Sequence, residues 1–283
     1  MRTVLLLCAL AAVVGIALIV LFVSLPGLPF MLRVGPLSFL TGSAWDPGAG
    51  RYGVLPMIVG SLAVTFGALV IAVPLGIAVA IYLAEIAPKP VYEVTRLGLG
   101  VLAGIPSVVY GFYGLVVLVP LIREYLGGAG LSVLAGSLVL AVMVLPTITA
   151  VSEDSIKAVP NEYREGSIAL GATKWETIRN VVIPAAGSGI SASVVLGIGR
   201  AVGETMAVLM VTGNAVLFPR SPTDMARTLT GNIALEMAYA EGDHQRALFA
   251  TGLVLLLFIM GLNLFGERVL SAVHRYKSKQ VGR

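Results

Sequence analysis

Residues 54–84 read VLPMIVGSLAVTFGALVIAVPLGIAVAIYLA and contain no charged side chain. As an α-helix this stretch would be about 45 Å long at 1.5 Å per residue, which is longer than the hydrocarbon core of a bilayer. Pro74 removes one backbone hydrogen bond within it and favours a kink. The stretch therefore predicts a long membrane-spanning helix that is tilted, kinked or protruding.

The rest of the 283-residue chain has the same apolar character. Hydrophobic residues make up 57% of it and charged residues only 12%, whereas soluble domains carry about 25% charged residues. We therefore expect an all-α polytopic membrane protein. Its six transmembrane helices are predicted at 4–24, 54–84, 97–121, 131–151, 185–213 and 247–270. They form one transmembrane domain over 1–283, with an N-terminal anchor helix at 4–24, a permease core at 54–270 and a basic tail at 271–283.

The N-terminus has a second interpretation, because Arg2 before an apolar run is also typical of a signal peptide. The run from Val4 to Val23 is about 20 residues, longer than an ordinary signal-peptide core, and no small-residue cleavage site follows it. We interpret it as a retained anchor helix.

Lys and Arg residues are distributed unequally between the loops. With the N-terminus inside, 12 lie on the inner side and 6 on the outer side, and Arg200 within a span completes the 19. This bias predicts that both termini are cytoplasmic and accounts for the net charge of +4 without nucleic-acid binding. Cys8 is the single cysteine, and His244 and His274 have no partners at metal-ligand spacing, so we expect neither an internal disulfide nor a metal site.

Two long outer segments have different patterns. Residues 25–53 are rich in proline and glycine and predict a loop with turns. Within 214–246, the stretch Thr228 to Ala240 offers an apolar face and predicts a short helix, which either packs on the bundle or contributes to a docking surface.

Residues 152–184 form the long hydrophilic segment on the inner side. Pro160 suits the first turn of a helix, and Gly171 is placed to end that helix. Thr173 and Glu176 then have capping-box spacing, which predicts a second short helix. Pro184 would stand in the first turn of the fifth span. The segment therefore predicts a helix, a glycine elbow and a second helix before the membrane.

The elbow is either an inert connection or a contact site. Ala169, Trp175 and Ile178 are apolar residues with no evident cytoplasmic core to enter. A short helix that carries apolar residues outside the bilayer favours docking into a groove on a partner.

The elbow resembles the E-A-A-x3-G-x9-I-x-L-P signature of ABC importer permeases. It reads Glu165-Gly166-Ser167, three residues, Gly171, nine residues, then Val181-Val182-Ile183-Pro184, so the spacing matches throughout while four positions carry other small or aliphatic residues. The resemblance implies that this elbow is the coupling helix seated in the ATP-hydrolysing subunit. The residues implied in coupling are Glu165, Gly166, Ser167, Ala169, Gly171, Trp175 and Pro184.

Further motifs resemble those of the phosphate-uptake permeases, which are heterodimers of a PstC-type and a PstA-type subunit. The predicted outer segment Phe39–Ser43, with Trp45-Asp46-Pro47, is similar to the PstC-type subunit rather than the PstA-type subunit. The other matching motifs are Ile105–Gly111, Gly199–Ala207, Thr228-Leu229-Thr230 and Ile233–Met237. The resemblance implies a prokaryotic cell membrane, inorganic phosphate as cargo, a homologous second permease, two ATP-binding subunits and an outer phosphate-binding protein. The chain lacks G-x-x-x-x-G-K-[ST], so ATP-Mg is expected on the partner subunits, with no cofactor and no enzyme activity on this chain.

Arg200 and Glu204 lie within the fifth predicted span, at i and i+4. On a regular helix they would share a face and neutralise each other, with Gly199 and Gly203 allowing close helix packing. The functional alternative is an anion site on a translocation path, because a guanidinium matches phosphate geometry. The hydroxyls of Thr205, Ser107 and Tyr110 are the further candidates for this path.

Three alternatives remain open from the residues themselves. A secondary transporter would use Arg200 and Glu204 for proton or ion coupling, and a membrane-embedded enzyme would use Glu204 as a general acid or base. An ABC permease for another oxyanion, such as sulfate or molybdate, would share all the features of the phosphate permease.

Overall fold

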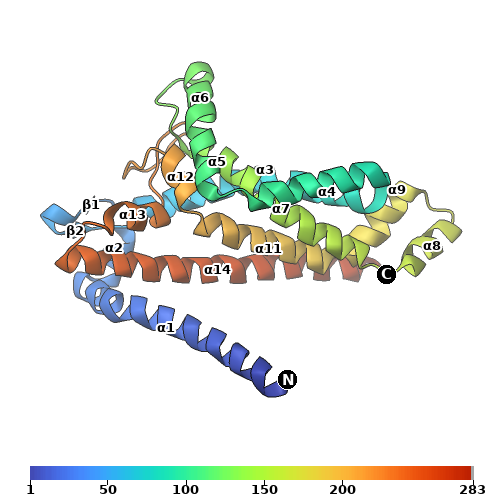
Figure 1. Cartoon of the computed structure of the whole chain (residues 1–283), viewed down its shortest axis with the longest axis horizontal. Helices are drawn as coiled ribbons and strands as arrows, with labels where there is room; N and C mark the ends of the chain where they lie inside the picture. Colours follow the sequence, from blue (N-terminus) through green and yellow to red (C-terminus); the bar gives the residue numbers. More distant parts are fainter. Residues whose placement is uncertain (282–283) are drawn as a thin grey trace.

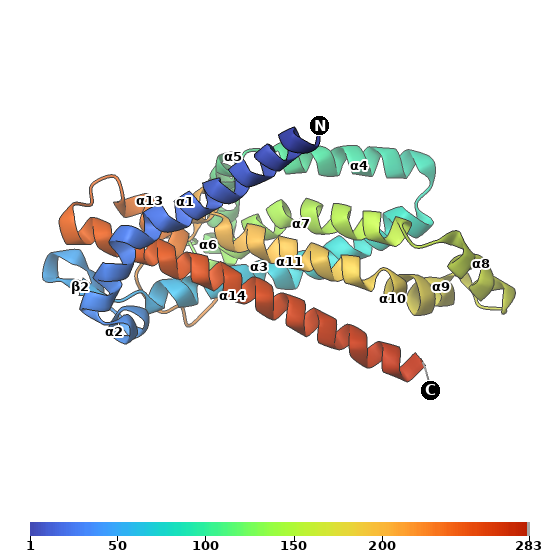
Figure 2. The same ribbon diagram turned by 90° about the horizontal axis from the view of Figure 1, so that it is seen from below.

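Four long helices form the centre of the molecule and pack along one another (Figures 1 and 2). They are α3 (Leu55–Ile81), α7 (Val133–Lys157), α11 (Gly187–Gly203) and α14 (Gly242–Val281). The structure, a computed structural model, describes residues 1–281; Gly282 and Arg283 of the predicted basic tail lie outside the described residues. The second, fourth and sixth predicted spans correspond to α3, α7 and α14.

The pair α3–α7 forms the largest helix–helix contact. Glycines on α3 let α7 approach closely. A Cβ atom on Gly67 would overlap Ser137 of α7, and a Cβ atom on Gly76 would overlap Ile148. The Ser137 hydroxyl donates to the Val64 carbonyl at 3.1 Å, and Thr149 donates to the Gly76 carbonyl at 3.3 Å. The helices are therefore joined by close packing and by hydroxyl–backbone hydrogen bonds, as expected where no water is available.

The N-terminal helix is longer than predicted. Helix α1 runs from Arg2 to Val34, through Pro26 and Pro29, and α2 (Pro36–Thr41) follows. The loop prediction for 25–53 is therefore wrong for its first half, because the two prolines were read as helix ends. Gly27 packs directly on the backbone of α14 at Phe249, so tertiary contact supports the helix there.

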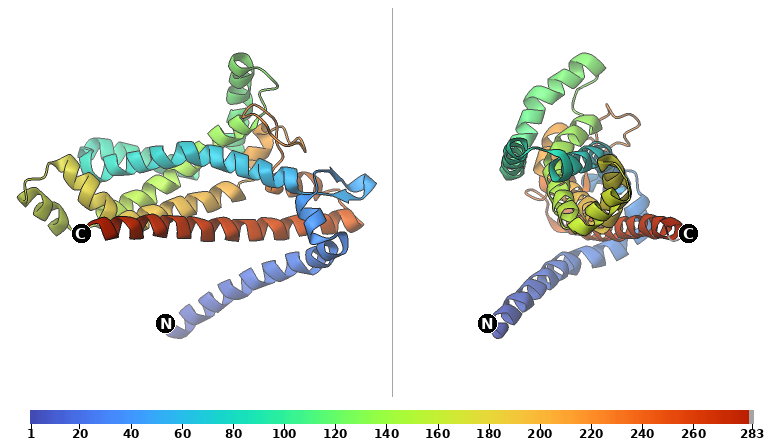
Figure 3. Two further views of the ribbon diagram at one scale, coloured as in Figure 1. Left: turned by 180° about the vertical axis from the view of Figure 1, so that it is seen from behind. Right: turned by 90° about the vertical axis from the view of Figure 1, so that its right-hand side faces the viewer.

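Figure 3 shows that α1 meets α14 near the C-terminal end of α1 and that the N-terminal half of α1 diverges from the bundle. After α2, the strands β1 (Trp45–Asp46) and β2 (Arg51–Tyr52) pair in antiparallel fashion around the short helix η1 (Pro47–Ala49).

The third predicted span, 97–121, is not one helix. Helix α4 (Lys89–Gly104) ends at Ile105, whose φ of −67° and ψ of 129° are extended. Pro106 explains the break, because a proline disfavours helical geometry in the residue before it. A second helical stretch follows as α5 (Ser107–Tyr113), the π-helical turn η3 (Gly114–Leu118) and α6 (Val119–Leu126), and α6 projects from the bundle (Figure 1).

The fifth predicted span, 185–213, is also broken. The helical stretches Lys174–Ala185 and Gly187–Gly203 meet at an angle of 67°. Helix α11 then ends at Gly203, Glu204 is extended with φ −69° and ψ 131°, and the short α12 (Met206–Val211) begins. Among the described residues, five helices are long and apolar enough to span a membrane, or six if the bent pair counts as one span.

The remaining elements lie at the two ends of the bundle. The π-helical turn η2 (Tyr82–Ile86) continues α3, and the inner segment contains α8 (Asn161–Ala169), α9 (Lys174–Thr177), η4 (Ile178–Val182) and α10 (Ile183–Ala185). At the opposite end, α13 (Leu229–Glu236) is the short helix predicted over Thr228 to Ala240. It packs on α3 and α14 with Leu229 and Asn232 fully buried, so the packing interpretation is confirmed.

A buried ionic cluster holds α13 in place. The carboxylate of Glu236 accepts hydrogen bonds from Arg227 Nη1 at 2.6 Å, from Trp45 Nε1 at 2.7 Å and from the His244 ring at 2.8 Å. Arg227 also donates to the Asn214 carbonyl and to the Asn232 side chain. The cluster thus joins the β1–β2 segment, α13 and the start of α14.

Candidate functional site

The inner segment folds as the sequence predicts, into two short helices with a glycine between them. Helix α8 follows Pro160, and Gly171 has a φ of +90°, which a side chain other than glycine rarely adopts. The Ser167 hydroxyl lies 2.9 Å from the Thr177 hydroxyl, so α8 and α9 are held side by side. We call residues 160–184 the elbow.

A complete capping box starts α9. The Thr173 backbone N–H and hydroxyl both donate to Glu176 Oε2 at 2.8 Å, and the Glu176 N–H donates back to the Thr173 hydroxyl at 3.3 Å. The backbone hydrogen bond from Thr173, followed by the hydroxyl hydrogen bond, lowers the pKa of Glu176.

The tip of the elbow exposes apolar side chains. Leu170 is 91% exposed, and Tyr163, Ile168 and Trp175 are also exposed. Glu165, Gly166 and Ala169 are exposed as well. Ile178 differs from the sequence-based expectation: its side chain is buried within the elbow and does not contribute to the exposed face.

Pro184 lies in α10, before the bend that precedes α11. The sequence placed it in the first turn of the fifth span, and the structure instead gives it to a one-turn helix ahead of that span. It fixes the backbone where the chain turns from the elbow toward α11.

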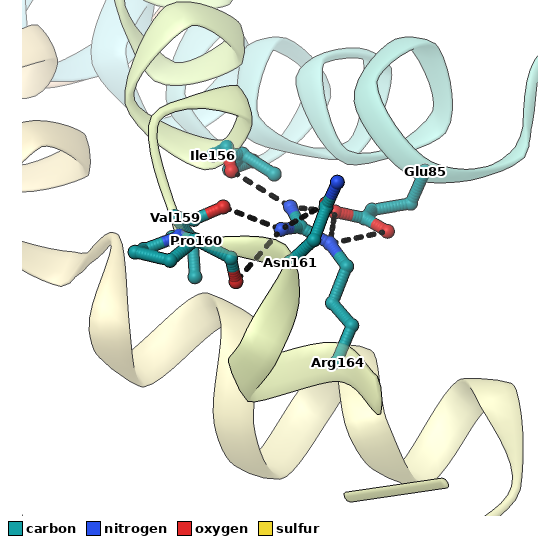
Figure 4. Close-up of polar contacts among 6 residues, drawn as sticks. All are labelled: Glu85, Ile156, Val159, Pro160, Asn161 and Arg164. Atoms are coloured by element: carbon teal, nitrogen blue, oxygen red, sulfur yellow. Dashed lines mark hydrogen bonds and ion pairs between the residues drawn. The ribbon is translucent and has the colours of Figure 1, made fainter. Parts of the chain in front are cut away.

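Arg164 anchors the elbow to the bundle (Figure 4). Its guanidinium donates to Glu85 Oε1 from Nη2 at 2.6 Å and from Nε at 3.1 Å, and it also donates to the backbone carbonyls of Ile156 and Val159. Sequence reasoning missed this contact, because 79 residues separate Glu85 from Arg164. The available signal was Glu85 itself, a single acidic residue directly after a long apolar run.

The predicted pairing of Arg200 with Glu204 is wrong. Arg200 is in the last turn of α11, and its Nη1 donates to the Thr147 hydroxyl of α7 at 3.2 Å. Glu204 lies beyond the end of the helix, and its Oε1 accepts the backbone N–H of Ala207 at 3.2 Å, at the start of α12. The i, i+4 argument failed because it assumed a regular helix through Gly203.

Arg200 is exposed on this chain, although α11 belongs to the bent pair of helical stretches that together are long and apolar enough to span a membrane. It is about 20 Å along α11 from Gly187 at 1.5 Å per residue. Ala192, Leu196 and Gly203 are exposed on the same helix, so an uncovered stripe runs along it. Gly203 has no atom near its Cβ position and Gly199 is only in loose contact with Asn263, so these glycines do not form a tight helix–helix contact among the described residues.

The helix break at Glu204 is surrounded by hydroxyl groups. The Glu204 carbonyl accepts a hydrogen bond from Thr230 at 3.0 Å, and Thr205 donates to the Gly203 carbonyl at 3.3 Å. A cavity of about 10 Å³, room for about one water molecule, lies between Glu204 and the side chains of Ser61, Thr65, Thr228 and Thr230.

Ser107 and Tyr110 lie on α5, which packs against α12 beside this break. A Cβ on Gly111 would overlap Ala207, so the two helices are in close contact. The Tyr110 hydroxyl donates to the Leu102 carbonyl across the Ile105 break at 2.7 Å. The structure thus places α5 next to Glu204 and Thr205, while the role of these hydroxyls in a path stays a prediction. Within the described residues, no group of three or more His, Cys, Asp or Glu could hold a metal ion.

The elbow, the bent fifth span and the exposed helix break together define the inner-membrane subunit of a solute importer. Residues 72–278 match the family of binding-protein-dependent transport system inner membrane components, and the chain belongs to this family. It is a transport subunit rather than an enzyme.

Among individual relatives, the chain is 47% identical to the probable ABC transporter permease protein YqgH of Bacillus subtilis, over 92% of this chain and 88% of that protein. It is 38% identical to the phosphate transport system permease protein PstC of Mesorhizobium japonicum, over 77% of this chain and 73% of that protein. The phosphate transport system permease protein PstC of Haemophilus influenzae is 35% identical to this chain, over 86% of this chain and 83% of that protein.

Solved structures show the same fold at low identity. A bacterial ABC transporter involved in alginate import aligns with a TM-score of 0.67 at 15% identity, over 96% of each chain. The MetNI methionine ABC transporter aligns with a TM-score of 0.57 at 22% identity, over 78% of this chain and 94% of that one.

Proposed function

We propose that this chain is the permease subunit of an ATP-driven ABC importer that moves inorganic phosphate into the cell. The family supports the class, and the relatives named as phosphate transport permeases support the cargo. The single observation that carries the transport role is Arg200, a guanidinium that is uncovered near the end of the bent stretch from Lys174 to Gly203, which is long and apolar enough to span a membrane.

The exposure of Arg200 has two consequences. A guanidinium that faced lipid would cost several kcal/mol, so this face of α11 must meet protein or water. A second permease of similar fold that covers the stripe along α11 would enclose a polar path between the two subunits. Arg200 would then offer two parallel hydrogen bonds to phosphate, and Glu204 would keep the net charge low enough for the anion to leave.

The other partners follow from the two ends of the bundle. The exposed apolar tip of the elbow fits a groove on an ATP-binding subunit, with Glu165, Gly166, Ser167, Ala169, Gly171 and Trp175 on or near the contact. We assign this end to the cytoplasm, together with both termini, since α1 and α14 both run from the β1–β2 end toward it (Figure 1). A phosphate-binding protein would dock at the β1–β2 and α13 end. ATP-Mg would be held by two ATP-binding subunits, and the whole chain would act as one transmembrane domain.

The test is phosphate uptake by the complete complex in liposomes. We expect uptake to require ATP and the binding protein, and we expect Arg200→Gln to abolish it while the ATP-binding subunit still co-purifies. Normal uptake by the Arg200→Gln complex would refute the role of Arg200. A Ser38→Ala complex, altered at a residue on α2 at the other end, serves as the matched control and should transport normally.

The same liposomes separate the remaining alternatives. Uptake that continues without ATP and collapses with an uncoupler would identify a secondary transporter. Faster uptake of sulfate or molybdate than of phosphate would identify a different oxyanion importer.

A further inference from the structure

Arg164 joins the elbow to the ends of two helices: α7, which directly precedes the elbow in the chain, and α3, which is distant in sequence. It belongs to α8 of the elbow, it binds Glu85 in η2 at the inner end of α3, and it binds the Ile156 and Val159 carbonyls at the inner end of α7 (Figure 4). A guanidinium is suited to this position because it can donate to a carboxylate and to carbonyls at the same time.

The link is shielded from water. The Glu85 side chain is 8% exposed and that of Arg164 19%. Separating the two groups would leave a carboxylate in a site of low polarity without a partner, which is strongly unfavourable. The elbow therefore cannot shift against α3 and α7 unless this link breaks.

The second contact between the elbow and the inner end of α3 is of a different kind. Val182 and Ile178 of the elbow are buried, and Val182 packs in an apolar cluster with Ala80 and Ile156. Apolar contacts are not directional and permit sliding, whereas the hydrogen bonds of Arg164 fix the position of α8 relative to α3 and α7.

Both helices that Arg164 holds lead to the proposed anion site. Helix α7 carries Thr147, the hydrogen-bond partner of Arg200, about 14 Å from Ile156 along the helix. Helix α3 carries Ser61 and Thr65, which line the cavity beside Glu204. A displacement of the elbow that is passed to α3 and α7 therefore reaches both sides of the helix break.

We propose that Arg164 and Glu85 are positioning residues that make α3 and α7 move with the elbow when the ATP-binding subunits move it. This inference rests on the proposed transport function. The covalent routes from the elbow lead through α10 to α11 and through residues 158–160 to α7. The Arg164–Glu85 link adds α3 to the moving unit, and the Arg164–carbonyl hydrogen bonds stiffen the short connection to α7. Neither residue touches the transported anion.

The test compares phosphate transport with ATP hydrolysis in the reconstituted complex. For Arg164→Gln and for Glu85→Gln we expect at least a tenfold fall in phosphate molecules transported per ATP hydrolysed, while binding-protein-stimulated hydrolysis stays within twofold of the unaltered complex. An unchanged ratio in both variants would overturn the proposal.

The double variant Arg164→Gln with Glu85→Gln separates a positioning role from a merely structural one. It leaves no buried charge unpaired, so we expect assembly and thermal stability to recover toward the unaltered values while the transport ratio stays low. If the ratio recovered together with stability, the link would be structural only and the proposal would fail.

Arg96→Gln is the matched control. Arg96 Nη1 lies 3.5 Å from Glu153 Oε1 at the same end of the bundle, so this change weakens an ion pair with a buried carboxylate without touching the elbow. We expect a normal transport ratio. Failure of the unaltered complex to transport phosphate would refute the proposed function itself, whereas transport by the unaltered complex and by all variants alike would refute only this inference.

A direct measurement of motion uses spin labels on the elbow and on η2, which continues α3. Glu162 on α8 and Ile86 in η2 are exposed and suitable for labelling, and replacing Cys8, the single cysteine, by serine gives a clean background. On ATP binding we expect the distance between the labels to stay constant in the unaltered chain and to change or broaden in Arg164→Gln. A distance that responds equally in both would contradict rigid coupling.

Discussion

Replacing Glu236 by glutamine should destabilise the end of the bundle that carries β1, β2 and α13. The Glu236 side chain is 9% exposed, and Arg227, Trp45 and His244 all donate to its two oxygens. A glutamine offers one acceptor oxygen, so its amide nitrogen would oppose at least one of these donors. Arg227 would also lose its anionic partner in a buried site.

The expected cost follows from these contacts. Removing one partner of a buried ion pair costs about 3–5 kcal/mol. Arg227 keeps its bonds to Asn214 and Asn232, at 2.8 and 3.1 Å, which places the cost near the lower end, about 3 kcal/mol. For a chain of this size, that corresponds to a fall in Tm of roughly 6–12 °C.

Trp45 provides the assay, because it belongs to the cluster and is one of only two tryptophans. With Trp175 replaced by phenylalanine, thermal unfolding in detergent can be followed by the fluorescence of Trp45 alone. Asp46→Asn is the control: its ion pair with Arg51 at 3.1 Å is exposed, so we expect a cost below about 1 kcal/mol. Equal Tm values for Glu236→Gln and Asp46→Asn would refute the reasoning.

Two further predictions concern the elbow. Gly171→Ala forces a side chain into a φ of +90°, at a cost of about 1–2 kcal/mol, and should reduce co-purification of the ATP-binding subunit. Gly98→Ala within helix α4, where a Cβ would meet open space outside the elbow, should leave recovery unchanged. The hydrogen bonds of Thr173 lower the pKa of Glu176 in the folded state. The capping box therefore contributes its full stabilisation at pH values above the unfolded-state pKa near 4.5, and this stabilisation is lost as the pH falls through the lower pKa of the folded state. Hydrogen exchange of the α9 amides in the intact complex, corrected for intrinsic rates, should therefore rise in this acid range, and Glu176→Gln should remove the pH dependence.

Local signals in the sequence predicted much of the fold. The uncharged run 54–84 became α3 and η2, and the capping box at Thr173 and the positive φ of Gly171 were found where the residue types required them. These features depend on residues close together in the chain, so one sequence is sufficient to predict them.

The broken helices show where local signals were misread or missing. Pro106 was a sufficient reason to end a helix at Ile105, but the apolar run through it favoured a continuous span. No comparable signal marks the break at Glu204, which is stabilised by the Thr230 hydroxyl from 26 residues away. The first helix was predicted too short, because Pro26 and Pro29 were given too much weight against the helical pattern around them.

The functional residues divide in the same way. Arg200 was identified because a charge within an apolar run is visible in the sequence. Its partner Thr147 was not identified, because it lies 53 residues away. The Arg164–Glu85 and Glu236 clusters depend on contacts between distant segments, and a single chain without related sequences gives no means to pair them.

The uncovered guanidinium of α11 also constrains how the importer is made. A newly inserted copy that has not yet found its companion would hold a bare cation within hydrocarbon, a state that favours aggregation or proteolysis. On the proposed pairing with a second permease, the two polypeptides should be needed in matched amounts, and an excess of this chain should be degraded until its counterpart is supplied.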